Sequence, residues 1–333
     1  MLFLKKIWRP LLALALLLIL IKKGPFDLNQ LKFVFGQPKI ILLGILIFFG
    51  QILIWSYRWK LFVNLFTPIP FFKVMQLTLV GMFFNFFIPG GVGGDIVKAI
   101  ELSKNKSTSR SKALSTVMSD RIFGLFAMIA LATIFLAVDY VQTPTDFILK
   151  IGLSSAFIFS GMTVALLFLP FIFKMISQTL VQKDSKILRT IEKLVNSLNF
   201  TFITFRNKKI QAKSFIASSV SQFLAIYFLY TVVMALGVTP PSFMLFFSLC
   251  CFGFVASALP IMPGGVGVGQ YAFYFLFVNV SEEVGKASIT AITTLQIFTL
   301  LYALVGGLIF AFNPAVKHDV EEYEKSNTLN KNV

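Results

Sequence analysis

Two glycine-rich motifs interrupt apolar segments of this chain, and they hold the residues best suited to binding a ligand. The first reads FIPGGVGGDIVKA from Phe87, and the second reads LPIMPGGVGVGQYAF from Leu259. Proline stops a helix because it lacks an N–H donor, and glycine permits the tight turn that follows. Each motif therefore predicts a helix break, at which backbone N–H groups and charged neighbours can meet a ligand.

The first motif places two charges directly after its glycines. Asp95 and Lys98 are three residues apart, so they share one face of a helix that starts after Gly94. In the functional interpretation, Asp95 holds the hairpin or binds a cation, while Lys98 and glycine N–H groups meet a lipid phosphate. In the alternative interpretation, Asp95 is only an N-cap and Lys98 is an interfacial lysine. The glycines of this candidate site are Gly90, Gly91, Gly93 and Gly94.

Asp120 and Arg121 form a second charged pair, which we expect at the start of a membrane span. A guanidinium group binds phosphate through two parallel hydrogen bonds, so Arg121 is a candidate phosphate ligand. Alternatively, Arg121 extends to the membrane surface beside a capping Asp120.

The second glycine motif carries no charge. Gly264, Gly265 and Gly267 predict a turn like the first one, and the Gln270 amide could hydrogen-bond a lipid headgroup. The alternative interpretation is a turn that serves only packing.

The composition predicts an all-α polytopic membrane protein. Of the 333 residues, 57% are hydrophobic and 13% are charged, and the mean hydropathy is +0.83. Apolar runs of about 20 residues are long enough to cross ~30 Å of hydrocarbon. We expect a single transmembrane domain over 1–316 and a polar cytoplasmic tail over 317–333. The expected full spans are 7–21, 40–57, 118–138, 151–173, 214–236 and 287–312.

The distribution of basic residues predicts that 71–103 and 243–280 are re-entrant helical hairpins of opposite orientation. If each segment returns to the side it came from, most Lys and Arg residues fall in cytoplasmic loops, as the positive-inside rule requires. Both termini are then cytoplasmic, and the two hairpins form a possible inverted repeat. The basic segment 22–39 fits this arrangement poorly, and we expect an interfacial amphipathic segment there.

Several other features favour structural roles. The net charge of +16 sits in loops beside apolar spans, which favours contact with anionic lipid over nucleic acid. The adjacent Cys250 and Cys251 are expected to be packing residues, and the one histidine, His318, leaves no histidine-dependent metal or acid–base site. We expect an amphipathic surface helix over 183–213. We expect an interfacial aromatic belt at Trp8, Trp55, Tyr57 and Trp59.

Four segments resemble one known family. They are RW at Arg58, FFIPGGVGGDIVKA from Phe86, SDRIFGL over 119–125 and LPIMPGGVGVGQ over 259–270. Along almost its whole length the chain resembles the transmembrane region of lysylphosphatidylglycerol synthase, the flippase-like or UPF0104 membrane family. The resemblance implies a glutamate where this chain has Gln270, and the soluble aminoacyl-transferase domain is missing. It therefore implies lipid translocation rather than lysyl transfer.

The leading hypothesis is a flippase-like transporter that moves an anionic phospholipid or a polyprenyl-linked precursor between leaflets of a bacterial inner (plasma) membrane. The alternatives are a component of a phosphatidylglycerol lysyltransferase, or an accessory subunit of a membrane glycosyltransferase. The sequence has no nucleophile–base set and no P-loop lysine, so an enzyme is disfavoured. We expect no cofactor and no metal; a partner enzyme or a homo-oligomer is possible.

Overall fold

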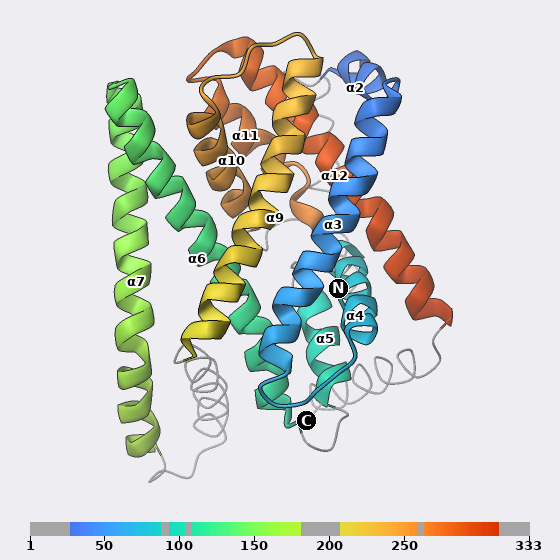
Figure 1. Ribbon diagram of the computed structural model, residues 1–333, viewed down its shortest axis with the longest axis vertical. Coiled ribbons are helices and arrows are strands. Elements are labelled where there is room, and N and C mark those ends of the chain that lie inside the picture. Colours follow the sequence, from blue (N-terminus) through green and yellow to red (C-terminus); the bar gives the residue numbers. More distant parts are fainter. Residues whose placement is uncertain (1–26, 88–92, 104–107, 181–206, 259–262, 313–333) are drawn as a thin grey trace, which may run out of the picture.

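The described part of the chain is built from helices. The computed structural model describes residues 27–87, 93–103, 108–180, 207–258 and 263–312, and every regular element within these ranges is helical (Figure 1). The expected span 7–21, the tail 317–333 and most of the expected surface helix 183–213 lie outside these residues.

Five of the helices are long and apolar enough to cross a membrane. To within one residue, they contain the five expected spans that fall in the described ranges. They are α3 (Pro38–Val63), α6 (Arg110–Gln142), α7 (Asp146–Leu180), α9 (Lys208–Ala235) and α12 (Glu282–Phe312).

Local sequence signals set the starts of these helices. Pro38 opens α3, where its missing N–H group would have had no partner in any case. Side-chain oxygens of Ser109 and Asn207 accept hydrogen bonds from backbone N–H groups in the first turns of α6 and α9. Polar capping residues therefore mark where apolar helices begin.

The first glycine motif joins two short helices that pack against each other. They are α4 (Phe71–Phe87) and α5 (Gly93–Ser103). At 1.5 Å per residue they are about 25 Å and about 16 Å long, shorter than the ~30 Å hydrocarbon layer. In Figure 1 the chain enters α4 and leaves α5 at the lower end of the bundle. This is the arrangement expected for a hairpin over 71–103.

The second glycine motif lies between α10 (Phe243–Ser257) and α11 (Val268–Phe277), with the short 3₁₀ helix η1 (Pro263–Gly265) at the turn. Both helices are again too short to span, and in Figure 1 they lie at the upper end of the bundle. The two hairpins therefore point toward each other from opposite ends, as the charge distribution predicted.

The C-terminal end of α4 meets the turn of the second hairpin inside the bundle. Helix α4 contacts η1, and the ring of Phe86 occupies the space that a Cβ at Gly264 would need. Helix α4 also packs on α12, where a Cβ at Gly306 would overlap the backbone of Leu79. Glycines at these crossings let the first hairpin sit deep between the long helices.

An aromatic core joins the spanning helices around the hairpins. The rings of Phe48, Phe228 and Phe298 lie with centroids 5.6–5.9 Å apart and connect α3, α9 and α12. A short helix, α2 (Leu28–Phe35), packs on α3 and α12 and lies within the segment 22–39.

Candidate functional site

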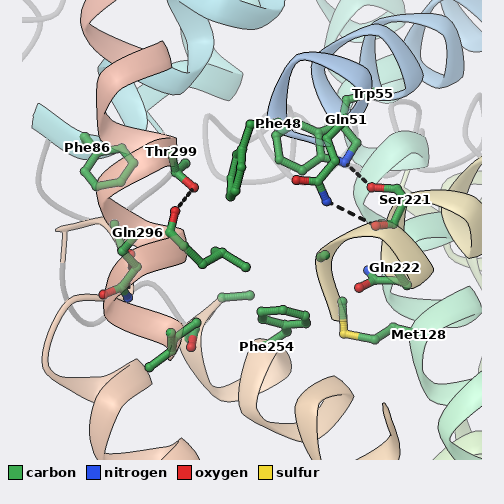
Figure 2. A pocket seen from close by; sticks show the side chains of 16 residues that line it. Phe48, Gln51, Trp55, Phe86, Met128, Ser221, Gln222, Phe254, Gln296 and Thr299 are labelled. Atoms are coloured by element: carbon green, nitrogen blue, oxygen red, sulfur yellow. Dashed lines mark hydrogen bonds between the residues drawn. The ribbon is translucent and has the colours of Figure 1, made fainter. Parts of the chain in front are cut away.

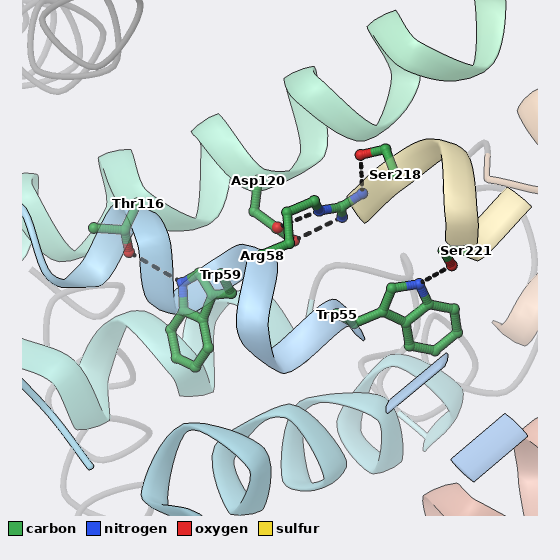
Figure 3. Close-up of polar contacts among 7 residues, drawn as sticks. All are labelled: Trp55, Arg58, Trp59, Thr116, Asp120, Ser218 and Ser221. Atoms are coloured by element: carbon green, nitrogen blue, oxygen red, sulfur yellow. Dashed lines mark hydrogen bonds and ion pairs between the residues drawn. The ribbon is translucent and has the colours of Figure 1, made fainter. Parts of the chain in front are cut away.

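Two ion pairs bring α3, α5 and α6 together. Arg58 of α3 donates from Nε to Asp120 Oδ1 at 2.7 Å and from Nη2 to Oδ2 at 3.0 Å (Figure 3). Arg121, the next residue along α6, forms an ion pair through Nε with Asp95 of α5. Neighbouring charges on α6 therefore bind two different helices instead of each other.

The pair between Arg58 and Asp120 is nearly buried. Their side chains are 11% and 14% exposed, and Arg58 Nη1 also donates to Ser218 Oγ at 2.9 Å. A Cβ at Gly124 would lie 3.0 Å from the guanidinium, so glycine leaves the space that this group occupies. A buried ion pair is tolerated when its polar atoms are hydrogen-bonded in this way.

Lys98 completes a cluster of five charges. Its ammonium lies 4.9 Å from the ring centroid of Trp59, within the cation–π range. Its electrostatic environment includes Asp95, Asp120, Arg121 and Arg58. Among the described residues no acidic group forms an ion pair with Lys98, so three positive charges face two negative ones. We call Arg58, Asp95, Lys98, Asp120 and Arg121 the charge cluster, which carries a net charge of +1 when all five are ionised.

Helix boundaries correct one expectation about the charge cluster. Helix α6 begins at Arg110 with Ser109 as its cap, so Asp120 and Arg121 lie about three turns into the helix and do not open it. The span expected over 118–138 lies within this helix, whose first turns are polar. Asp120 is thus an ion-pair partner and not a helix cap.

The tryptophans of α3 correct a second expectation. Trp59 is 1% exposed, and its Nε1 donates to Thr116 Oγ1 at 3.2 Å; Trp55 donates to Ser221 Oγ at 2.8 Å (Figure 3). The interfacial belt is therefore wrong for Trp59, which packs inside the protein. Tyr57 is exposed, as a belt residue would be, and Trp8 lies outside the described residues.

The glycines of the first motif serve a close helix contact. A Cβ at Gly94 would overlap the carbonyl of Gly81 on α4, and the Gly94 N–H group donates to Asn85 Oδ1 at 2.9 Å. This N–H group was expected to meet a phosphate, but in the structure it bonds within the hairpin. Gly93 is buried beside it, while Gly90 and Gly91 lie outside the described residues.

Gln270 stabilises the turn of the second hairpin through hydrogen bonds. It is 1% exposed, its Oε1 accepts from the Gly267 N–H group at 2.7 Å, and its Nε2 donates to Gln296 Oε1 at 2.6 Å and to Thr293 Oγ1 at 3.2 Å. Gln296 in turn donates to the Gly264 carbonyl at 3.4 Å. Protein groups thus engage both ends of the Gln270 amide, and a contact of this amide with a headgroup stays a prediction.

The remaining glycines of the second motif supply backbone conformation. Gly264, Gly265 and Gly267 have φ values of 60°, 68° and 87°, in the left-handed region that favours glycine. The sequence-predicted residues of the two motifs are therefore not brought into one site: the charge cluster forms beside the first hairpin, and a neutral amide network holds the second.

A cavity of about 340 Å³ lies between the end of α4 and the turn of the second hairpin (Figure 2). Phe86 of α4 and Gly264 of the turn line its wall, and most of its surface is apolar. Its polar groups are neutral amides, hydroxyls and an indole. These polar residues are Gln51, Trp55, Ser221, Gln222, Ser257, Gln296 and Thr299.

A polar stripe connects the cavity to the charge cluster. Gln51, Trp55 and Arg58 are spaced four and three residues apart, so they share one face of α3. Gln51 Nε2 donates to the Ser221 carbonyl at 3.1 Å, next to the bond that Trp55 makes with the same residue, and Arg58 bonds Ser218 one turn away. The cluster and the cavity are neighbours along the contact between α3 and α9.

Sequence reasoning missed part of this arrangement. Arg58 was noted only within a family-like segment, and the serines of α9 were not singled out. Ser214, Ser218 and Ser221 recur at helical spacing in an apolar helix, a signal that could have indicated an inward polar face. Within the described residues, no group of three or more His, Cys, Asp or Glu side chains could hold a metal ion.

Similar proteins are membrane proteins of one family. A UPF0104 membrane protein of Pyrococcus horikoshii is 26% identical over 93% of this chain and 97% of its own length. A UPF0104 membrane protein of Methanothermobacter thermautotrophicus is 25% identical over 68% of this chain and 70% of its own. No solved structure matches the chain. The family described as "Lysylphosphatidylglycerol synthase TM region" matches residues 7–307, so this multi-pass membrane protein belongs to that family.

Proposed function

We propose that this protein is a flippase-like transporter that moves an anionic phospholipid or a polyprenyl-linked precursor between membrane leaflets. The observation that carries the proposal is the charge cluster beside the first hairpin, with its excess positive charge and a lysine lacking an ion-pair partner among the described residues. We place both termini on the cytoplasmic side of the plasma membrane, because that orientation puts the most basic loops inside.

Lys98 and Arg121 are the residues best suited to the phosphate of such a lipid. Charges at membrane depth are costly unless they are paired or functional. The Lys98 ammonium lies over the Trp59 ring and near Asp95 and Asp120, but it forms no ion pair with an acidic group among the described residues. The Arg121 side chain is 37% exposed, so its guanidinium is accessible while it pairs with Asp95. A phosphate beside these two groups would neutralise the cluster's net charge.

The opposed hairpins support movement across the bilayer rather than binding on one side. Broken helices that enter from both faces and meet at a central site are the arrangement that many transporters use for alternating access. Here the end of α4 and the turn of the second hairpin border one cavity, and a polar stripe leads to it from the charge cluster. Neutral amides and hydroxyls along that route can hydrogen-bond a headgroup without holding it too tightly.

A liposome assay tests the proposal. The purified chain is reconstituted into phosphatidylcholine liposomes containing a trace of fluorescent phosphatidylglycerol, and dithionite then quenches the label that reaches the outer leaflet. We expect quenching beyond the outer-leaflet share, with or without an imposed ion gradient. Lys98→Gln and Arg121→Ala should slow the added quenching by about tenfold or more, since each removes a charge-assisted phosphate contact.

Arg110→Ala is the matched control, because it removes an exposed arginine from the first turn of the same helix. It should quench like the parent protein. If Lys98→Gln and Arg121→Ala both flip at the parent rate, the site is assigned wrongly. If the parent gives only outer-leaflet quenching for phosphatidylglycerol and for a polyprenyl phosphate, with and without a gradient, the proposed transport is wrong.

A further inference from the structure

The outer side of the contact between α3 and α9 carries a groove of about 410 Å³, separate from the central cavity. Its walls are apolar: Leu53 and Ile54 come from α3, and Ile216, Ala217 and Val220 come from α9. Ile216 and Val220 are 61% and 44% exposed, on helices long and apolar enough to span a membrane. In the bilayer this groove therefore faces lipid chains.

One end of the groove is polar and basic. Tyr57, Phe71 and Lys213 line it, and the Lys60 ammonium lies 6.0 Å from the centroid of the Phe71 ring. Lys213 is exposed, and no acidic residue lines the groove. From Lys213 to Val220 the groove follows roughly 10 Å of α9, at 1.5 Å per residue. Two lysines thus lie at the end of an apolar channel that runs along the helix axis.

We propose that this groove binds one anionic phospholipid, with an acyl chain along α3 and α9 and the phosphate between Lys60 and Lys213. Lysines at the ends of membrane helices extend their ammonium groups toward the headgroup layer, where they attract anionic lipid. Tyr57 adds a hydroxyl at the same level, and the apolar walls match the chain. The proposal concerns a lipid held at the protein surface and does not depend on transport through the charge cluster.

The position of the groove gives this lipid a direct relation to the central cavity. Helices α3 and α9 separate the two, and their facing sides carry the bonds of Ser218 and Ser221 to Arg58, Gln51 and Trp55. The groove residues lie on neighbouring sides of the same helices, at the outer edge of this contact. A lipid in the groove would therefore press on the helix contact that separates the bilayer from the cavity.

Native mass spectrometry of the full chain in detergent tests the proposal, with phosphatidylglycerol or phosphatidylcholine titrated in. We expect the parent protein to retain phosphatidylglycerol preferentially. The double variant Lys60→Gln/Lys213→Gln should bind phosphatidylglycerol at least about fivefold more weakly. Each lysine near anionic lipid contributes about 1 kcal/mol, and the loss of one such contribution already corresponds to about fivefold in affinity. Its matched control, Lys208→Gln/Lys209→Gln, removes two exposed lysines from the start of α9 and should bind like the parent.

A second variant tests the apolar part of the groove independently of its two lysines. Val220→Trp fills the apolar end, leaves both lysines in place, and should reduce retention of phosphatidylglycerol and phosphatidylcholine alike. Equal retention by the groove variants and by the lysine control would overturn the proposal. So would loss of phosphatidylglycerol in Lys98→Gln but not in Lys60→Gln/Lys213→Gln, which would place the lipid at the charge cluster. Failure of the flipping assay leaves this result unaffected, so the two proposals fail separately.

Discussion

The two glycine motifs share the five letters PGGVG, and the glycines that the structure describes in each motif serve different physical needs. In the first, Gly94 is needed for space, because the α4 backbone at Gly81 lies where its Cβ would be. In the second, Gly264 and Gly265 are needed for conformation, because their φ values of 60° and 68° are unfavourable for residues with a side chain. Space at Gly94 and backbone conformation at Gly264 and Gly265 are thus two separate physical reasons for glycine in these motifs.

Their polar surroundings differ as well. The first hairpin carries Asp95 and Lys98 into a cluster of five charges, whereas the second is held by the neutral amides of Gln270 and Gln296. Charged groups bind a ligand strongly, but burying them at membrane depth costs free energy. A network of neutral amides stabilises a turn at a lower cost. This contrast is why we propose the charge cluster, and not the second hairpin, as the ligand-binding site.

The largest loss of stability is expected from removing the nearly buried ion pair between Arg58 and Asp120 in the charge cluster. Arg58→Gln leaves Asp120 nearly buried without its partner, which should lower the free energy of unfolding by about 3–5 kcal/mol. The midpoint of thermal unfolding in detergent, followed by circular dichroism, measures the loss. Arg58→Gln/Asp120→Asn should recover much of it, and a double variant no more stable than Arg58→Gln would show that the charge pairing is not the cause.

The next largest loss of stability is expected when the close contact between α4 and α5 in the first hairpin is disturbed. Gly94→Ala forces α4 and α5 apart, and overpacking of this kind lowers the free energy of unfolding by about 1–3 kcal/mol or more. Gly161→Ala on α7 is the matched control, because a Cβ there meets nothing within 4 Å. The control should unfold at or slightly above the parent midpoint. Equal midpoints for the two variants would contradict the packing role of Gly94.

The amide network around Gln270 carries no charge. Its contribution to the free energy of unfolding should therefore depend on side-chain shape and on hydrogen bonds. Gln270→Leu leaves the Gly267 N–H group and the Gln296 amide without their bonds, at a cost of about 1–3 kcal/mol. Gln270→Glu should cost less, because a neutral carboxyl group can still accept from the Gly267 N–H group and donate its O–H to Gln296 Oε1. The same unfolding measurement ranks them, and a less stable glutamate variant would contradict this account.

The smallest change in stability is expected at Lys98, for which we propose a direct contact with the lipid phosphate. Lys98→Gln removes one cation–π contact with Trp59 and no ion pair among the described residues, so the free energy of unfolding should change by about 0.5–1 kcal/mol. The liposome flipping rate should nevertheless fall by about tenfold or more, and Lys98→Arg should retain part of it. A variant that flips normally would place the ligand elsewhere.

Hydropathy and charge predicted most of the fold. Runs of about 20 apolar residues can be satisfied in a bilayer only as helices, so the five described spans were readable from composition. The basic loops predicted that both glycine motifs belong to hairpins entering from opposite ends. The span expected over 118–138 lies within α6, whose polar first turns, beginning at Arg110, do not register as apolar sequence.

The sequence by itself thus determined the class of protein, the two helix breaks and the charges near the first of them, because these depend on local composition and backbone chemistry. Only the tertiary structure decided which charges pair, since Arg58 and Asp120 are 62 residues apart in the chain. It also decided that Trp59 is buried, and that Ser218 and Ser221 face α3 instead of lipid. These outcomes depend on the rotation of each long helix about its axis and on the angles at which the helices cross. Contacts between distant residues fix both, and hydropathy records neither.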